Sequence, residues 1–433
     1  MPGSPARVIP RRAVVSWVLY DLANTIFSMG VVSVFFSLYV REAVGLDRAD
    51  TTYAAITAVS MGLIFVISPL LGAMTDRARR RMPFLVWSTL ICCGATALFA
   101  RGPFAVSVFL FILANAAYQA GIQFYDALLP EVSTPDNRGR VSGIGVGVGY
   151  LGSYVAVLLG MAMPAGERTT LFTLIAVMFL ALAVPCFLFV RERGNPNPRP
   201  IFGWAMIRQS TRETVAALRS GSRFPGLLRF LVGRVFYTDA INTVIAYMTL
   251  FTVNVAIAGG LDAADGEAEA LRVMLSAITC AVAGGLLWGR LVDHVGPKRT
   301  LTVVLLLWVA TFSLAAAVGL FRMPVVFLYL VAAMAGVALG GIWSADRPYM
   351  LCLTPPDRIG EFYGLYGMVG RFSAVSGPIL WGVVLYVSLE WLGLPVLTGQ
   401  SLAILTLLLM ILASMFILRK VTDEHRDWSA LAR

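Results

Sequence analysis

The sequence predicts an all-α membrane protein with twelve transmembrane helices in two related six-helix halves. Of its 433 residues, 58% are hydrophobic and 13% are charged, whereas a soluble domain carries about 25% charged residues. The apolar residues form runs of about 20, long enough to cross about 30 Å of hydrocarbon as helices. The short alternating segments typical of a membrane β-barrel are absent from the sequence. Several polar motifs also recur half a chain apart, which predicts an internal duplication.

Twelve apolar runs follow one another along the chain. They cover residues 14–40, 52–73, 83–100, 104–126, 140–162, 169–190, 229–257, 271–290, 299–320, 323–346, 362–388 and 398–418. The first run is preceded by arginines, as in a signal peptide, but it is too long, contains Asp21 and lacks a small-residue cleavage site. We therefore expect it to be a retained first helix.

The runs divide the chain into three parts. Residues 1–190 and 229–433 each hold six runs, and residues 191–228 form a polar linker. Within the linker, the segment Trp204–Leu218 has the pattern of an amphipathic surface helix. We interpret the segment as a solvated connection between the halves, and binding of the basic helix to anionic lipid is the alternative.

The net charge of +10 follows from topology and gives no reason to expect nucleic acid as a partner. If the N-terminus is cytoplasmic, the inner loops and tails hold 26 of the 34 Lys and Arg residues. This imbalance is the positive-inside pattern and predicts that both termini are cytoplasmic. Nearly all the basic residues are Arg, which is typical of a GC-rich bacterial genome. We expect the protein to lie in the inner membrane of a bacterium.

Cofactor and metal chemistry are not expected. The five cysteines lie in or near apolar runs and are interpreted as small hydrophobic residues. The sequence has no Walker motif and no nucleophile–base pair in a plausible setting, so we expect neither an ATP-driven pump nor an enzyme. The glycines between Gly143 and Gly152 follow no strand, which favours close helix packing over a phosphate-binding loop.

Two motifs recur at nearly the same offset. The pattern Asp-x-x-Asn-Thr occurs at Asp21–Thr25 and, 218 residues later, at Asp239–Thr243. The pattern Gly-x-x-x-Asp occurs at Gly72–Asp76 and, 217 residues later, at Gly289–Asp293, each time followed by basic residues. A duplicated six-helix unit is the simplest explanation.

The loop motif resembles the signature loop of the major facilitator superfamily. Other segments resemble the Unknown Major Facilitator family, a vacuole-effluxer-like branch of that superfamily whose fungal members are linked to autophagy and amino-acid release. These segments are Trp17–Phe27, Phe124–Glu131, Arg138–Gly143, Phe236–Asp239, Glu361–Tyr366 and Gly370–Ser373. The resemblance covers both halves and implies the major facilitator fold, alternating access and solute export. This chain departs from the family's pattern at Thr25, where Ser is usual, at Arg371, where Lys is usual, and at Asn242.

The signature loop is expected to form a cytoplasmic latch. Gly72 permits close helix approach, and Asp76 can accept hydrogen bonds from a helix N-terminus or an arginine. The alternative is an ordinary positive-inside loop. Asp126, Asp136 and Asp346 are interpreted as rim residues that pair with loop arginines. The predicted latch residues are Gly72, Asp76, Arg77, Arg80, Asp126, Gly289, Asp293 and Arg299.

Polar side chains within the runs are candidates for substrate binding and coupling, because they are costly when they face lipid. The resemblance implies that the first, fourth, seventh and tenth helices line a cavity. The candidates are Tyr20, Asp21, Asn24, Asn115, Tyr118, Gln119, Asp239, Asn242, Tyr247, Trp343 and Arg371.

Three of these candidates carry charge, and their roles stay open. Arg371 lies near mid-membrane and either binds a substrate carboxylate, pairs with Asp239, or fixes packing. Asp21 and Asp239 either carry a coupling proton, bind a substrate amine, or brace their helices. Asp21 is the better candidate for a titrating group, and Asp239 for an ion-paired one.

The function predicted from these features is secondary active transport of a small, amino-acid-like polar solute. The expected partners are that solute, the lipid bilayer and, for a coupled transporter, protons, and we expect a monomer. Two alternatives remain at this point. One is export of amphipathic drugs or lipids, and the other is a membrane receptor or scaffold that does not transport.

Overall fold

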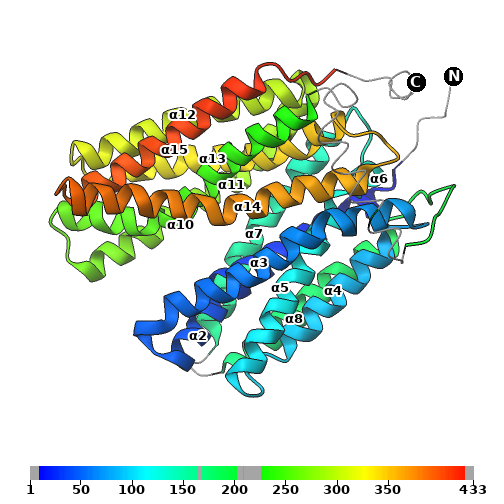
Figure 1. Cartoon of the computed structure of the whole chain (residues 1–433), viewed down its shortest axis with the longest axis horizontal. Helices are drawn as coiled ribbons and strands as arrows, with labels where there is room; N and C mark the ends of the chain where they lie inside the picture. The colour runs from blue at the N-terminus through cyan, green and yellow to red at the C-terminus, as the bar shows by residue number, and fades with distance from the viewer. Residues whose placement is uncertain (1–8, 164–166, 202–207, 209–225, 425–433) are drawn as a thin grey trace. The chain divides into compact units, whose positions relative to one another are not determined.

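The computed structural model describes residues 9–163, 167–201, 208 and 226–424. Within these residues the chain is helical and contains no strand (Figure 1). The predicted amphipathic helix Trp204–Leu218 lies outside the described residues apart from Arg208. Contacts divide the chain into two units: unit 1 is Met1–Ala216 with Thr354–Met368, and unit 2 is Ala217–Leu353 with Val369–Arg433.

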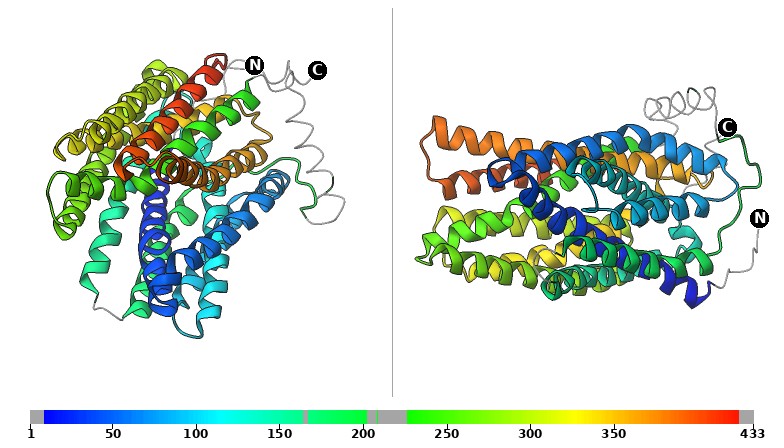
Figure 2. Two further views of the ribbon diagram at one scale, coloured as in Figure 1. Left: turned by 60° about the vertical axis from the view of Figure 1, so that its left-hand side comes forward. Right: turned by 90° about the horizontal axis from the view of Figure 1, so that it is seen from below.

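Unit 1 begins with one long apolar span. The helix α1 (Arg11–Phe27) continues through the π-helical segment η1 (Ser28–Phe35) into α2 (Phe36–Val44). The other helices of this unit are α3 (Leu46–Arg77), α4 (Met82–Ala97), α5 (Phe104–Asp126), the short α6 (Leu129–Val132), α7 (Arg138–Ala162) and α8 (Arg168–Phe189). The helices α4, α5 and α8 lie side by side (Figures 1 and 2).

Unit 2 repeats this order of long helices. They are α10 (Leu227–Ala258), α11 (Ala263–Val295), α12 (Pro297–Leu320), α13 (Phe327–Cys352), α14 (Ile359–Tyr386), the π-helical segment η2 (Val387–Trp391) and α15 (Val396–Leu418). The first ten residues of α14, Ile359–Met368, belong by their contacts to unit 1, and the rest of α14 belongs to unit 2.

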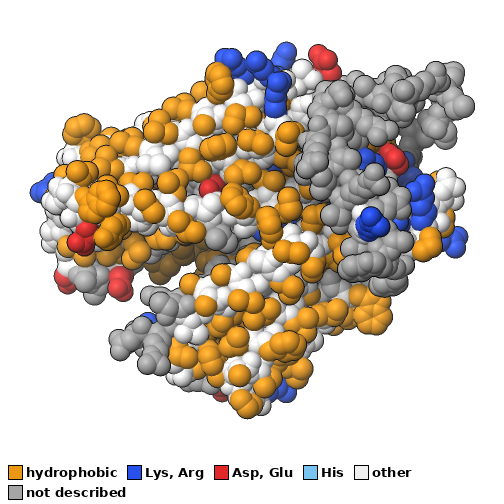
Figure 3. Space-filling view, in the orientation of Figure 1, with side chains coloured by type: hydrophobic (Ala, Val, Ile, Leu, Met, Phe, Trp, Pro, Cys, Tyr) orange, Lys and Arg blue, Asp and Glu red, His pale blue; other side chains and the backbone are white. Residues whose placement is uncertain are grey.

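The helices coincide with the apolar runs. Eleven spans of the described chain are long and apolar enough to cross a membrane, and the 16-residue helix α4 supplies a shorter twelfth. Large side chains such as Val66, Trp87 and Phe416 are exposed on these helices. The face in Figure 3 is largely hydrophobic, with most charged side chains toward its edges. A surface of this kind is stable against lipid hydrocarbon, and the predicted all-helical membrane fold is confirmed.

The duplication is also visible in the ends of equivalent helices. Ala100 follows α4 and Arg322 follows α12, and both adopt the left-handed backbone conformation, 222 residues apart. Glu192 accepts hydrogen bonds from the backbone N–H groups of Arg81 and Met82, where α4 begins. Asp423 accepts one from the backbone N–H of Lys298, where α12 begins. Capping by an acidic residue that follows the last helix of each half satisfies these exposed donors.

Candidate functional site

The first Asp-x-x-Asn-Thr motif packs against the glycines of α7. A β-carbon added to Gly145 would lie 2.8 Å from the Trp17 ring and 3.1 Å from Asp21 Oδ2. One added to Gly152 would lie 2.7 Å from the carbonyl oxygen of Leu22. Asp21 and Trp17 therefore lie on the face of α1 that contacts α7, and this close contact depends on the glycines.

Tyr20 lies in the buried interior of unit 1. Its hydroxyl hydrogen-bonds that of Thr89 on α4 at 2.7 Å. Its ring stacks on Tyr125 of α5 with centroids 5.1 Å apart, and Tyr125 stacks in turn on Trp17 at 4.4 Å. These contacts join α1 to its neighbouring helices, so the structure gives Tyr20 a packing role.

Asn24 and Asn115 bring buried amide groups into the same unit. The Tyr118 hydroxyl donates to the carbonyl oxygen of Asn24 at 3.3 Å, and Asn115 Nδ2 donates to Ser60 at 2.9 Å. Among the described residues, neither Asn24 Oδ1 nor Asn115 Oδ1 has a hydrogen-bond partner. Gln119 is half-buried on the same helix as Asn115. Two amide oxygens are therefore available as acceptors, and a buried acceptor left without a donor is unfavourable.

The second motif lies on α10, and its Asp239 contacts α14 in unit 2. Asp239 accepts a hydrogen bond from the Ser376 hydroxyl at 2.9 Å. Asp239 is the thirteenth residue of α10, about 18 Å from the start of the helix at 1.5 Å per residue. It is therefore deep in its span. Further along the same helices, the ring of Tyr247 stacks on Trp381 at 4.8 Å with an interplanar angle of 5°.

The remaining candidates on unit 2 differ in exposure. Asn242 on α10 and Trp343 on α13 are half-buried. Arg371 is 5% exposed and lies about 18 Å along α14. Its guanidinium is thus placed near the middle of a membrane span, where a cation is costly without an interacting group.

A buried ion pair in unit 2 differs from what the sequence suggested. Arg234 Nε of α10 lies 2.9 Å from Asp346 Oδ2 of α13, and these residues are 3% and 0% exposed. The Tyr237 hydroxyl donates to Asp346 Oδ1. We expected Asp346 to be a rim group paired with a loop arginine, and this prediction is wrong. The helix α13 continues to Cys352, beyond the end of the apolar run, so Asp346 lies inside the helix and meets a helix arginine.

The predicted latch residue Asp76 binds the N-terminus of α14 within unit 1. Its two carboxylate oxygens accept hydrogen bonds of 2.7 Å from the backbone N–H groups of Gly360 and Glu361. Arg81 forms an ion pair with Asp76 at 2.8 Å. A β-carbon at Gly72 would lie 2.2 Å from the carbonyl oxygen of Gly360, so this contact requires glycine. A carboxylate at a helix N-terminus is favourable because unsatisfied donors and the helix dipole meet it there.

A second contact holds the same part of α14. The Ser68 hydroxyl donates to the carbonyl oxygen of Gly364 at 3.0 Å and lies 2.5 Å from Gln123 Oε1. Gln123 Nε2 returns a hydrogen bond to the Ser68 carbonyl oxygen. The start of α14 is therefore hydrogen-bonded to α3 at two positions, Asp76 and Ser68, and Gln123 of α5 holds Ser68 in place.

The other predicted latch residues occupy varied positions. Arg77 and Asp293 are half-buried, Asp126 and Gly289 are buried, and Arg80 and Arg299 are exposed. Asn195, from the segment after α8, donates to the carbonyl oxygen of Asp76 at 2.7 Å. This chain segment thus braces the loop between α3 and α4.

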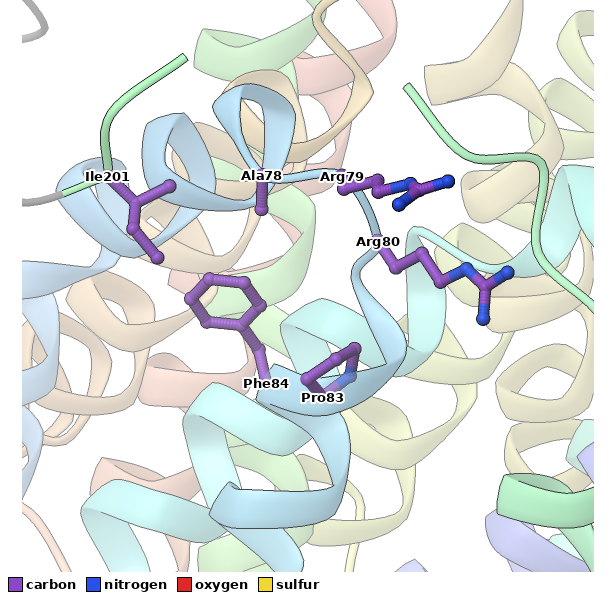
Figure 4. A pocket seen from close by; sticks show the side chains of 6 residues that line it. All are labelled: Ala78, Arg79, Arg80, Pro83, Phe84 and Ile201. Atoms are coloured by element: carbon purple, nitrogen blue, oxygen red, sulfur yellow. The ribbon is translucent and has the colours of Figure 1, made fainter. Parts of the chain in front are cut away.

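A pocket of ≈ 460 Å³ lies beside this loop. Its lining is Ala78, Arg79, Arg80, Pro83, Phe84 and Ile201 (Figure 4). The two arginine side chains extend away from the apolar ones. None of the predicted substrate residues lines this pocket, so it is separate from the polar groups of the spans.

Comparisons with known proteins identify the family. Residues 42–415 match the family model described as "Vacuole effluxer Atg22 like". The chain is 23% identical over 431 residues to the uncharacterized MFS-type transporter YxiO of Bacillus subtilis, covering 94% of each chain. It is 24% identical over 288 residues to autophagy-related protein 22 of Yarrowia lipolytica, and this match spans 57% of the chain and 45% of the fungal protein.

Solved structures show the same fold. The human organic anion transporter MFSD10 matches with a TM-score of 0.69 and 16% identity, over 94% of this chain and 98% of that one. The proton:xylose symporter XylE matches with a TM-score of 0.67 and 12% identity, over 98% of each chain. With the family match over most of its length, the chain belongs to the Atg22-like vacuole effluxer family and is a transporter of the major facilitator type.

Proposed function

We propose that the protein exports a small amino-acid-like solute by alternating access, as a secondary transporter of the bacterial inner membrane with both termini in the cytoplasm. The observation that carries the proposal is Arg371, which is 5% exposed and lies near the middle of α14. Arginine presents a planar fork that matches a carboxylate with two parallel hydrogen bonds. A solute with a carboxylate is therefore the best match.

Unit 1, taken by itself, contains buried acceptors that suit a polar solute. Asn24 Oδ1 and Asn115 Oδ1 are buried amide oxygens with no hydrogen-bond partner in the described part of the chain. An ammonium or hydroxyl donor satisfies these acceptors and removes the penalty of burying them alone.

Movement of the solute needs an energy source, and no nucleotide-binding motif occurs in the sequence. The proposal therefore includes coupling to a cation gradient. A proton carried on Asp21 is the form suggested by the sequence.

The experiment is efflux of labelled solutes from proteoliposomes, screened over amino acids, sugars and amphiphiles. Arg371→Lys keeps the charge and supplies the residue usual in the family, whereas Arg371→Gln removes the charge. We expect amino-acid efflux to fall by at least tenfold in Arg371→Gln, equivalent to about 1.4 kcal/mol of lost binding, and less in Arg371→Lys. Efflux of amphiphiles that is unchanged in both variants would instead support drug or lipid export.

A further inference from the structure

Oxygen atoms from two helices of unit 2 converge beside Gly377. A β-carbon added to Gly377 would lie 1.8 Å from Thr243 Oγ1, 2.4 Å from Asp239 Oδ1 and 3.1 Å from the Asp239 carbonyl oxygen. Asp239 Oδ2 accepts a hydrogen bond of 2.9 Å from Ser376. One carboxylate and two hydroxyls from α10 and α14 thus meet within a small space.

Two of these oxygens are buried and have no hydrogen-bond partner among the residues that can be described. They are Asp239 Oδ1 and Thr243 Oγ1, and the two residues are 4% and 0% exposed. A buried carboxylate oxygen and a buried hydroxyl are both unfavourable unless something binds them. Both lie against the same glycine, so a single bound ion can contact both.

The first copy of the motif also faces a glycine, Gly149, but its threonine hydroxyl has a partner within its own helix. Thr25 donates to the carbonyl oxygen of Asp21, four residues earlier, at 3.1 Å. This is a common way for a helical Thr to satisfy its hydroxyl. Thr243 occupies the equivalent position and makes no such bond within the described structure. Its oxygen is left available to a ligand.

The helix α14 offers a further oxygen at this level. Pro378 lies inside α14 and has no N–H, so one backbone carbonyl of the preceding helical turn lacks its usual donor. Carbonyl oxygens released where membrane helices are interrupted coordinate small cations in secondary transporters.

The charge and the size of the oxygen cluster select the ion. Hard cations prefer oxygen ligands. One carboxylate balances one positive charge, whereas a divalent ion would leave net charge in a low-dielectric interior. The close approach of the Gly377 backbone to Thr243 and Asp239 favours a small cation such as Na⁺ over the larger K⁺ or an organic ammonium.

We propose that Asp239, Thr243 and Ser376 form a Na⁺ site in unit 2. The role of this ion as the coupling ion rests on the proposed transport function, whereas its binding does not. In that role, Na⁺ at Asp239 takes the place of the proton that we considered at Asp21.

The test measures the thermal stability of the purified protein in Na⁺, K⁺ and choline at constant ionic strength and pH. A ligand of the folded state raises the apparent Tm in a saturable way. We expect this rise with Na⁺ only, and we expect it to be lost in Asp239→Asn and Thr243→Val. Ser376→Ala should raise the half-saturating Na⁺ concentration about tenfold, as expected for loss of one ligand. Thr25→Val is the matched control from the first copy of the motif and should keep the full Na⁺ response.

Three results would overturn the site: equal Tm in Na⁺ and choline, a Na⁺ response retained in both Asp239→Asn and Thr243→Val, or equal loss in Thr25→Val. To guard against poor folding of Asp239→Asn or Thr243→Val, direct binding of ²²Na⁺ is also measured for Thr243→Ser. This variant keeps the hydroxyl and should bind Na⁺. Proteoliposomes with separate Na⁺ and pH gradients separate the two proposals. Solute flux that is driven by pH alone contradicts Na⁺ coupling, whereas Na⁺ binding without flux of any solute contradicts the transport function.

Discussion

Removing the Asp346 carboxylate is expected to destabilise unit 2 strongly. Asp346 is fully buried, lies 2.9 Å from Arg234 Nε and accepts a hydrogen bond from Tyr237. In Asp346→Ala the guanidinium of Arg234 stays buried without this carboxylate, a change that costs about 3–5 kcal/mol. The lost acceptor of Tyr237 costs about 1–3 kcal/mol. Because the two terms overlap, we expect a total loss of about 4 kcal/mol.

Replacing both charges together gives a sharper test of this reasoning. Arg234→Met with Asp346→Leu removes the ion pair and fills similar volume with apolar groups, a replacement that is often neutral or stabilising. We expect this double variant to lose only the contribution of the Tyr237 hydrogen bond, about 1–3 kcal/mol, and so to be more stable than Asp346→Ala. Unfolding in mixed micelles with increasing SDS, followed by tryptophan fluorescence, measures these differences. A loss below about 1 kcal/mol in Asp346→Ala, or a double variant as unstable as the single one, would refute the reasoning.

Two further predictions concern unit 1. Gly72→Ala should lower the Tm because its β-carbon would lie 2.2 Å from the carbonyl oxygen of Gly360. The control is Gly62→Ala in the same helix, where a β-carbon would have nothing within 4 Å and the variant should raise the Tm slightly. Equal changes of Tm in the two variants would contradict the close contact. Burial raises the pKa of the Glu192 carboxyl group, so the folded chain binds the carboxyl proton more tightly than the unfolded chain does. The free energy of unfolding should therefore decrease as the pH rises above about 4.3, the pKa of a Glu side chain in the unfolded chain. A Tm–pH profile of Glu192→Gln should lack this decrease. An unchanged slope would contradict the assignment.

The helices and the duplication could be predicted from the sequence because both leave local signals. Apolar runs of membrane length mark the spans, and motifs at a constant offset mark the repeat. The end of a helix is less well marked. The run ending at 346 placed Asp346 at the rim, but α13 extends to Cys352. An error of six residues was enough to hide the partnership with Arg234.

The details of the polar clusters could not be predicted. Asp21–Thr25 and Asp239–Thr243 have the same pattern, and yet Thr25 bonds its own helix while Thr243 does not. The two copies also differ in how closely a glycine of a helix distant in sequence approaches the threonine: Gly377 of α14 lies nearer to Thr243 than Gly149 of α7 lies to Thr25. Tyr20 likewise shares a helical period with Asn24, but its hydroxyl is held by Thr89. Tertiary packing, rather than helical spacing, decides which polar atoms are left for a ligand.

Counterflow of labelled amino acids in liposomes that contain the purified protein tests the central claim most directly. Liposomes loaded with unlabelled solute should accumulate the labelled solute transiently, and Arg371→Gln should abolish this accumulation while Arg371→Lys retains part of it. Accumulation that is equal in Arg371→Gln and the wild type, or no exchange of any amino acid by folded protein, would contradict the claim that the chain transports an amino-acid-like solute.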